Sequence, residues 1–195
     1  MIYRRFGKRL FDIIISVFGL IVLLLPMLMI SLLIKFDSKG TVFFLQKRWG
    51  INRKDFTIYK FRTMIPNAFE IGGLVTSESD NRITRIGSVL RRTSLDELPQ
   101  FINIIKGDMS IIGPRPCIPH EYDEFETDAN YRKRFNALPG LFCSVDVDLR
   151  SAASFEKQFE MDAEYIENIT FTNDIKIFFG VFKTVLSGKN VYRDE

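Results

Sequence analysis

The chain has 195 residues, of which 46% are hydrophobic and 26% are charged, and its formal net charge at pH 7 is +3. Abundant Leu, Ile, Val and Phe exclude a wholly disordered or collagen-like protein, and the length suits one sizeable core. So small a net charge does not separate a nucleic-acid binder from a protein on anionic lipid. The cysteines, Cys117 and Cys143, lack metal-like spacing, and we expect free thiols in a reducing compartment.

Residues 13–34 form an uninterrupted apolar stretch without formal charge. As a straight helix of about 22 residues it would reach ~33 Å, enough to cross a bilayer core. The stretch is too long for the apolar part of a cleavable signal peptide, and no small-residue cleavage site follows it. We therefore expect it to remain in the mature protein.

Two features of this stretch argue against a simple span. Basic residues flank both ends: Arg4, Arg5, Lys8 and Arg9 before it, and Lys35, Lys39, Lys47, Arg48, Arg53 and Lys54 after it. The positive-inside rule therefore selects no orientation. Pro26 removes the hydrogen bond to the carbonyl of Val22, which is a recognised cause of a kink. We favour a re-entrant helix that breaks at Pro26 and returns; the alternative is a spanning helix with a tolerated proline.

The rest of the chain predicts a mainly α fold with a small β-hairpin. Residues 41–45 and 56–60 are typical of strands joined by a polar turn, and helical patterns cover 101–106, 121–135 and 154–166. We expect a re-entrant membrane-anchoring helix over residues 1–35 and a compact, membrane-associated cytosolic catalytic domain over 36–195. In the apolar tail 171–185, Phe178, Phe179 and Phe182 fit a core stripe or a membrane-lying face, and we favour the core.

The segment 91–100, RRTSLDELPQ, carries the most chemical information. Ser94 followed by Glu97 matches a capping box, which would place Asp96 and Glu97 near the positive end of a helix. Pro99 would bend a helix that begins at Ser94, because it lacks an amide hydrogen. A helix start bent in this way can expose its acids.

Arginines lie on both sides of this segment. Prolines on either side of Arg115 stiffen its turn and could present the guanidinium for bidentate phosphate binding, although a solvated loop arginine is the alternative. Carboxylates with arginines nearby suit phosphoryl transfer, in which a carboxylate can be a nucleophile or hold a divalent metal. Asp146 and Asp148 form an Asp-x-Asp triplet of the kind that metal-dependent glycosyltransferases use, but such triplets are common by chance.

Ordered motifs run along nearly the whole chain: KRLFD at 8–12, QKR at 46–48, YKFRTM at 59–64, DNRITRIG at 80–87, LR at 90–91, SLDELPQ at 94–100, Asn103, KGDMS at 106–110, GPRP at 113–116 and PG at 139–140. In these motifs the chain resembles the bacterial sugar transferase family, the small monotopic polyprenyl-phosphate phosphoglycosyl transferases. The resemblance implies a re-entrant membrane helix and an active site that faces the cytosol.

The resemblance also implies a reaction and residues for it. Asp96 would attack the sugar-linked phosphate of a UDP-sugar and release UMP, and undecaprenyl phosphate would then take the sugar phosphate from Asp96. Glu97 would accept a proton or assist a magnesium ion, which the Asp96 carboxylate would partly hold. Arg115 would bind phosphate, and Arg91, Lys60 and Arg62 are further candidates for substrate or phosphate binding.

The family setting is the cytoplasmic face of the bacterial inner membrane, where such enzymes begin a lipid-linked glycan of a capsule, an exopolysaccharide or a glycoprotein. The implied partners are a UDP-sugar, undecaprenyl phosphate and the membrane, with a homodimer and downstream glycosyltransferases as further candidates and no nucleic acid. We expect the minimal catalytic form. The sequence does not identify the sugar.

One region departs from the family pattern. After the PG motif the family usually continues with Thr-Gly, then a Gln and Asn-Gly-Arg, whereas residues 141–150 read LFCSVDVDLR, and only Arg150 matches. We expect this segment to shape the sugar or nucleotide pocket, so its divergence bears on substrate identity more than on reaction type.

Two rival hypotheses remain. A conventional glycosyltransferase would use Asp146 and Asp148 around a metal and release UDP instead of UMP. A non-catalytic membrane adaptor would use its arginines to bind lipid head groups, at about 1 kcal/mol each. The presence of Asp96, Glu97 and Arg115 argues against the adaptor, which would not need them.

Overall fold

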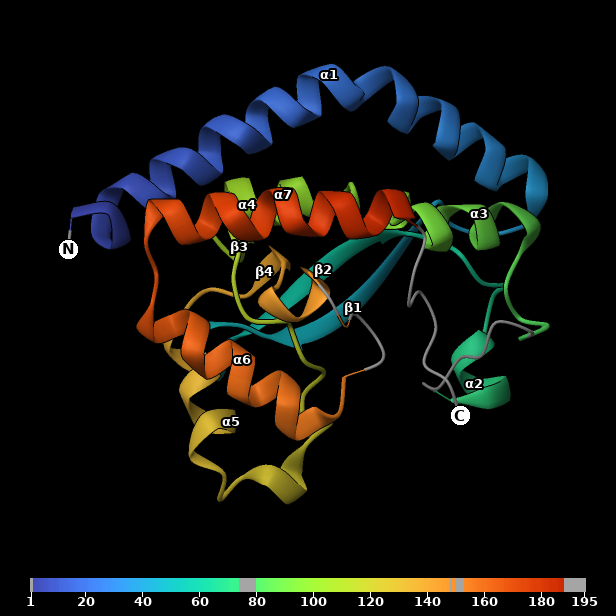
Figure 1. Cartoon of the computed structure of the whole chain (residues 1–195). Coiled ribbons are helices and arrows are strands. Elements are labelled where there is room, and N and C mark those ends of the chain that lie inside the picture. The colour runs from blue at the N-terminus through green and yellow to red at the C-terminus, as the bar shows by residue number, and fades with distance from the viewer. Residues whose placement is uncertain (1, 74–79, 148, 150–152, 188–195) are drawn as a thin grey trace.

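The computed structural model describes residues 2–73, 80–147, 149 and 153–187. Within these ranges the protein is mainly helical, with a long helix arched over small β-elements and shorter helices (Figure 1). The antiparallel hairpin was predicted. A second sheet, a parallel pair between residues 110–112 and 140–142, was not.

The described elements are, in chain order, the π-helical turn η1 (Tyr3–Gly7), α1 (Lys8–Asp37), β1 (Phe43–Trp49), the 3-10 turn η2 (Ile51–Arg53), β2 (Asp55–Phe61), α2 (Ala68–Gly72), α3 (Arg85–Thr93), the 3-10 turn η3 (Leu95–Glu97), α4 (Gln100–Lys106), β3 (Ser110–Ile112), the 3-10 turn η4 (Asp123–Phe125), α5 (Ala129–Lys133), the 3-10 turn η5 (Arg134–Asn136), β4 (Gly140–Phe142), the 3-10 turn η6 (Ser144–Val147), α6 (Phe155–Glu167) and α7 (Phe171–Ser187).

Most predicted elements are confirmed, and one is wrong. The hairpin strands are longer than expected, and helices cover the predicted patches at 101–106 and 154–166. The helix expected over 121–135 is instead divided into η4, α5 and η5. The reason is an N-cap inside the segment: Asp128 Oδ1 accepts hydrogen bonds from the amides of Asn130 (2.7 Å) and Tyr131 (2.9 Å), which starts a new helix there.

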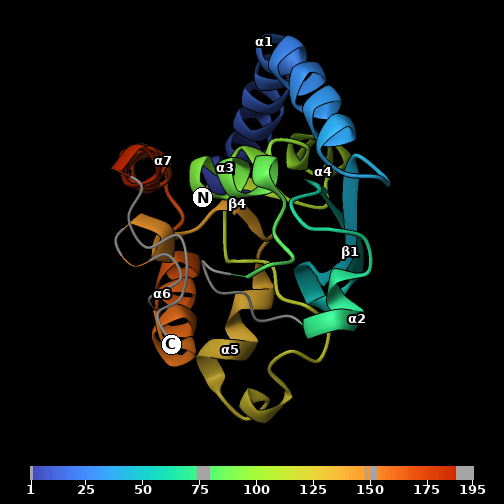
Figure 2. The same cartoon turned by 90° about the vertical axis from the view of Figure 1, so that its right-hand side faces the viewer.

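Helix α1 is continuous from Lys8 to Asp37, so Pro26 does not interrupt it as the prediction of a break required. The helix bows instead, and its two limbs descend toward the rest of the protein (Figures 1 and 2). Pro26 has no amide hydrogen for the ladder, and the Ser31 hydroxyl donates to the carbonyl of Met27 at 2.7 Å. Both features favour bending.

Both limbs of α1 are fastened to the same body. In the first limb, Asp12 Oδ1 accepts hydrogen bonds from the Ser110 hydroxyl (3.0 Å) and the Ile111 amide (2.9 Å). At the other end, Asp37 Oδ2 accepts a hydrogen bond from the Ile86 amide at 3.1 Å. The two ends of the helix therefore lie on one side of its arch.

The N-terminal segment is also attached to α7, through the buried carboxylate of Asp174. Its Oδ2 accepts from the Tyr3 hydroxyl (2.6 Å) and Lys8 Nζ (2.7 Å), and its Oδ1 accepts from the Tyr165 hydroxyl (2.8 Å). Its side chain is inaccessible to solvent, so the ion pair with Lys8 is held in a largely desolvated place. The N-terminus of the chain is thus tied to its last described helix.

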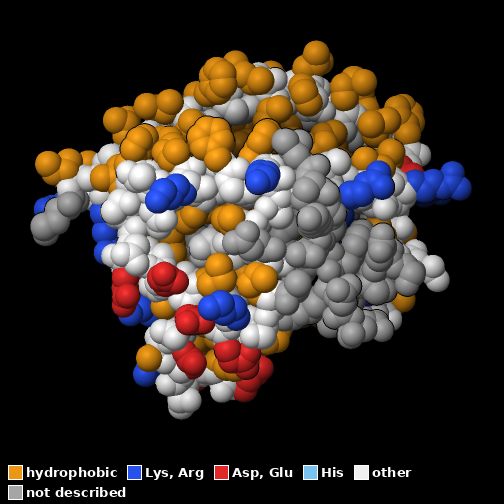
Figure 3. Space-filling model, viewed as in Figure 1, with side chains coloured by type: hydrophobic (Ala, Val, Ile, Leu, Met, Phe, Trp, Pro, Cys, Tyr) orange, Lys and Arg blue, Asp and Glu red, His pale blue; other side chains and the backbone are white. Residues whose placement is uncertain are grey.

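The outer face of the arch is apolar and uncovered. Among the described residues, one helical stretch, Tyr3–Asp37, is long and apolar enough to cross a membrane, and only 11% of its most apolar window is buried. Figure 3 shows hydrophobic side chains along this crest and basic side chains below it. Phe179 (64% exposed) and Phe182 (55%) of α7 are also uncovered, so the prediction of a core stripe is wrong for them; Phe178 packs on the core.

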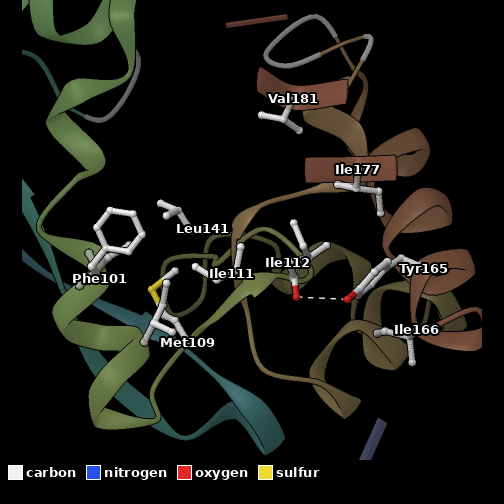
Figure 4. Close-up of a cluster of buried hydrophobic side chains, with 11 residues drawn as sticks. Phe101, Met109, Ile111, Ile112, Leu141, Tyr165, Ile166, Ile177 and Val181 are labelled. Carbon is white, nitrogen blue, oxygen red and sulfur yellow. Dashed lines mark hydrogen bonds between the residues drawn. The ribbon is translucent and has the colours of Figure 1, made fainter. Parts of the chain in front are cut away.

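The main core joins α4, β3, β4, α6 and α7 (Figure 4). Ile111 and Ile112 of β3 are fully buried at its centre. The Tyr165 hydroxyl lies 3.1 Å from the carbonyl oxygen of Ile112, and its one proton is shared between this contact and the shorter one to Asp174. A short strand buried in this way gives a fixed position to the turn that follows it, which contains Arg115.

Candidate active site

The Asp96–Glu97 pair lies in η3, between the end of α3 and the start of α4. Ser94 ends α3 in the left-handed conformation (φ 56°), and its side chain makes no capping hydrogen bond to the next turn, so the predicted capping box is wrong. Pro99 is the residue before α4. Its fixed φ and missing amide suit a helix start, which favours this boundary over a helix running through the proline.

Helix α3 lies against the chain that follows β2, and this brings two basic residues toward the acids. A Cβ on Gly87 would lie 1.9 Å from the Thr63 carbonyl oxygen, so only glycine permits the approach. Arg91 Nε donates to the Thr63 hydroxyl at 2.9 Å. From β2, Lys60 Nζ donates to Glu97 Oε1 at 2.7 Å.

These charges act on Asp96. Burial is the largest influence and raises the pKa of the Asp96 carboxyl to about 6, and the negative charge of Glu97 raises it too. The positive charges of Lys60 and Arg91 act in the opposite direction. The carboxylate is therefore largely ionised at neutral pH, yet it is more basic than an ordinary aspartate, which suits a nucleophile.

The turn with Arg115 follows β3 and is held on its backbone. The carbonyl of Pro114 accepts from the Gly140 amide (2.8 Å), the carbonyl of Arg115 accepts from Arg134 Nη2 (2.7 Å), and the carbonyl of Pro116 accepts from Arg48 Nη1 (3.1 Å). With three successive carbonyls fixed, the Arg115 side chain is preorganised, and half of its surface is exposed.

Beneath this turn lies a buried ion pair that the sequence did not predict. Arg134 Nη2 is 2.8 Å from Asp162 Oδ2, and both side chains are essentially inaccessible. Burial raises the pKa of Asp162 to about 6, against the influence of the Arg134 charge and the Arg115 amide. Burying two charges costs free energy, so a buried ion pair calls for an explanation. We infer that this pair holds Arg134 in place to donate to the Arg115 carbonyl and so supports the Arg115 turn.

Arg115 Nη1 lies 3.3 Å from Asp146 Oδ1. The other carboxylate oxygen, Oδ2, accepts from the Cys143 amide at 3.1 Å, and burial raises the pKa of Asp146 while Arg115 lowers it. Cys143 and Cys117 are buried free thiols, as predicted.

The negative charge of Glu97 also acts on Arg115 and on Asp146, so the arginine turn and the acidic pair belong to one neighbourhood. Asp148 and Arg150 lie outside the described residues.

Arg62 is not brought to this neighbourhood. Its side chain is buried and donates to the carbonyls of Ser38 (2.8 Å) and Lys39 and to the Ser38 hydroxyl (2.9 Å). The guanidinium thus caps the chain that leaves α1. Of the predicted site residues, Lys60 contacts Glu97, the charges of Lys60, Arg91 and Glu97 act on Asp96, and the charge of Glu97 acts on Arg115.

The site thus combines the Asp96 carboxylate, whose pKa is raised, with nearby positive side chains and the fixed turn that carries Arg115. Such a combination suits an enzyme that transfers phosphorylated groups, because catalysis of that reaction consists mainly of neutralising and positioning negative charge. Comparison with known proteins identifies the class more closely. The bacterial sugar transferase family model matches residues 3–188, and the chain belongs to this family.

Individual relatives agree. The chain is 39% identical over 187 residues to the UDP-N-acetylgalactosamine-undecaprenyl-phosphate N-acetylgalactosaminephosphotransferase of Aeromonas hydrophila (94% of this chain, 44% of the relative). It is 36% identical over 184 residues to the uncharacterized sugar transferase EpsL of Bacillus subtilis (94% and 89%). It is 37% identical over 192 residues to the UDP-glucose:undecaprenyl-phosphate glucose-1-phosphate transferase of Escherichia coli (94% and 40%). The chain thus spans under half of two of these relatives and most of the third.

Proposed function

We propose that the protein transfers a sugar 1-phosphate from a UDP-sugar to undecaprenyl phosphate through a phosphosugar carried on Asp96, and so begins a lipid-linked glycan. The observation that carries this proposal is the arrangement of the η3 turn: Asp96 adjoins Glu97, Lys60 Nζ lies 2.7 Å from Glu97 Oε1, and the positive charges of Lys60 and Arg91 favour the ionised form of Asp96. The names of the Aeromonas and Escherichia relatives, which describe transfer of a sugar phosphate to undecaprenyl phosphate, support it.

In the first step, an Asp96 carboxylate oxygen forms a bond to the sugar-linked phosphorus. The bond between that phosphorus and the oxygen bridging to UMP breaks, and UMP leaves with the electron pair. In the second step, a phosphate oxygen of undecaprenyl phosphate bonds to the same phosphorus, and the Asp96 carboxylate is released. A single carboxylate thereby serves two phosphoryl transfers in sequence.

The surrounding side chains have distinct parts in this scheme. Arg115, on its fixed turn, would bind a phosphate of the donor, and Arg91 would add positive charge from α3. Glu97 is held by Lys60 at 2.7 Å, where it can accept a proton or aid a metal. Arg62 donates its hydrogen bonds to Ser38 and Lys39, just after the end of α1, which argues for a supporting role rather than phosphate binding.

The acidic pair also fits a magnesium ion. Mg²⁺ in phosphoryl-transfer sites usually takes one or two carboxylates, with substrate phosphates and water as its other ligands. Asp96 would be one such carboxylate, assisted by Glu97, and the described residues contain no group of three or more potential ligands. When bound, the ion would neutralise charge on the diphosphate.

We further propose that α1 is re-entrant and that the catalytic body lies on the cytoplasmic face of the bacterial inner membrane. The attachment of both limbs of α1 to one body supports this, because a spanning helix would place its ends on opposite sides. The arched shape replaces the predicted break at Pro26: a bowed helix can enter and leave the same leaflet without interruption (Figure 2). A homodimer and downstream glycosyltransferases stay predictions from the sequence.

The reaction is tested by nucleotide release from a panel of UDP-sugars, with purified protein in detergent, undecaprenyl phosphate and magnesium. We expect UMP from at least one donor, no UMP from Asp96→Asn, and unchanged UMP from Asp123→Asn, which neutralises an exposed carboxylate that contacts His120. UDP release that survives Asp96→Asn would favour the Asp146/Asp148 glycosyltransferase instead. No nucleotide release from any donor would leave the adaptor or a sugar outside the panel.

The topology is tested by single cysteines introduced at the exposed positions Arg5 and Lys39, on either side of the apolar stretch. The natural thiols, Cys117 and Cys143, are buried and should give little background. A membrane-impermeant maleimide applied to inverted vesicles should label both new cysteines. Labelling of only one would indicate a spanning helix and contradict re-entry.

A further inference from the structure

The Arg115–Asp146 pair has a geometry that the proposed reaction does not use. A phosphate-binding arginine is expected to present free donors to its ligand, but here Nη1 faces a carboxylate at 3.3 Å. Asp146 is no chance neighbour, since its second oxygen accepts from the Cys143 amide and only 14% of its side chain is exposed. The η6 loop therefore fixes an anion where a substrate phosphate would bind.

Asp146 also lies in the segment 141–150, which departs from the family pattern in this chain. Family members share the reaction but differ in the sugar named for them, N-acetylgalactosamine in one relative and glucose in another. A charged side chain beside the phosphate site, in the segment where this chain departs from the family pattern, is well placed to distinguish donors.

We propose that Asp146 is a specificity-determining residue of the phosphate site: its carboxylate pairs with Arg115 in the free protein, yields Arg115 to the donor phosphate, and disfavours donors whose sugar carries its own negative charge. This inference rests on the proposed function, which assigns Arg115 to phosphate binding.

The exchange is physically reasonable. Charge-assisted hydrogen bonds of arginine are strongest at about 2.7–2.9 Å, so a contact at 3.3 Å is a weak one that a phosphate can replace. After the exchange, the Asp146 charge stays near the bound donor because its Cys143 contact does not involve Arg115. Two anions a few ångströms apart at a half-exposed site repel enough to change affinity about tenfold. A uronic acid donor adds a further anion and should suffer more.

The test measures donor binding without turnover. UDP-glucose and UDP-glucuronic acid are titrated calorimetrically into protein with the Asp96→Asn substitution, alone and combined with Asp146→Asn or Asp123→Asn. Asparagine at 146 is isosteric and can still accept from the Cys143 amide, so the loop should keep its shape. Asp123→Asn makes the same change in net charge at an exposed place.

We expect Asp146→Asn to tighten UDP-glucose binding about fivefold to tenfold and UDP-glucuronic acid binding more, with no effect of Asp123→Asn. The gain should shrink in about 0.5 M salt, because screening weakens the repulsion, whereas a change in loop shape would not respond in this way.

Unchanged or weaker UDP-glucose binding by Asp146→Asn would overturn the inference and leave the proposed function intact. An equal gain for the two donors would overturn the part that concerns sugar charge. If wild-type protein releases no UMP and the Asp96→Asn protein binds no UDP-sugar, the proposed function fails, and this inference fails with it.

Discussion

Replacing Arg134 by methionine is expected to destabilise the fold strongly and to weaken the phosphate site. Arg134 and Asp162 have 1% and 0% of their side chains exposed, so the substitution leaves a buried carboxylate without its counter-charge. Loss of one partner of such a pair typically costs about 3–5 kcal/mol. For a chain of this size, that lowers the melting temperature by roughly 6–20 °C.

The loss of stability should be larger at alkaline pH than at acidic pH. The folded pKa of Asp162, about 6, lies above the ordinary aspartate value of 3.8, so the folded protein binds the proton more tightly than the unfolded chain. Stability from this group is therefore fully present below about pH 4 and falls as the pH rises through 6. Without Arg134 the folded pKa rises further, so Arg134→Met should be more harmful at pH 8 than at pH 5.

Urea unfolding of the detergent-solubilised protein, followed by circular dichroism, measures these differences. Arg134→Met with Asp162→Asn is the matched variant, because it removes the uncompensated charge and should recover part of the stability. If Arg134→Met costs under about 1 kcal/mol at pH 8, or if the second substitution recovers nothing, the pair does not act as described. The double variant should still bind UDP-sugar more weakly, because the Arg115 carbonyl has lost its donor.

Three further outcomes are expected. The kcat/KM for the donor should fall about tenfold between pH 8 and pH 5, because only ionised Asp96, with a pKa of about 6, attacks; a flat acid limb would exclude it as the titrating nucleophile. Gly87→Ala should cost about 3 kcal/mol in urea unfolding, since its Cβ meets the Thr63 carbonyl oxygen, whereas Ala at exposed Ser88 should be neutral. Asp174→Asn should cost about 3–5 kcal/mol and speed proteolysis of the N-terminal segment; protection equal to wild type would show that its two contacts with that segment, from Tyr3 and Lys8, are dispensable.

The parts that sequence predicts well are those determined by near neighbours. The hairpin, α4, α6 and the apolar helix follow from periodicity, and Asp96 and Glu97 are adjacent in the chain, so their proximity required no fold. Motif resemblance then named Arg115 and Lys60 as companions, and the structure places Lys60 against Glu97.

The parts that sequence did not predict depend on long-range pairing. Asp162 is the partner of Arg134 only because α6 packs beside α5, and a carboxylate in an amphipathic helix is usually solvated. The same holds for Asp146, whose pattern suggested a metal motif and whose described partner is Arg115. The sequence shows which residues are charged but not which of them come into contact. Predicting such pairs therefore requires the three-dimensional structure.

Two local sequence patterns in the segment 94–99 predict different helix starts, and the structure agrees with one of them. Ser94 and Glu97 fit a capping box, yet proline at 99 fits a helix start, and both cannot hold within six residues. Helix α4 begins directly after the proline, which leaves the acids in a tight turn rather than inside a helix. Both residues are half-buried in this turn, and their adjacent positions allow one substrate to meet both carboxylates.

Helix α4 connects this turn to the apolar face. It begins directly after Pro99, and its Ile102 and Ile105 are exposed, while Arg9 of α1 donates to the carbonyl of Ile105 at 3.0 Å at its far end. The acidic pair is therefore only a few residues from side chains that suit contact with lipid. If α1 is re-entrant as proposed, a lipid-linked phosphate can reach Asp96 while its hydrocarbon chain stays in the bilayer, and the water-soluble donor can approach from the Arg115 side. The length of α4 would thus determine how far from the bilayer surface the two substrates meet.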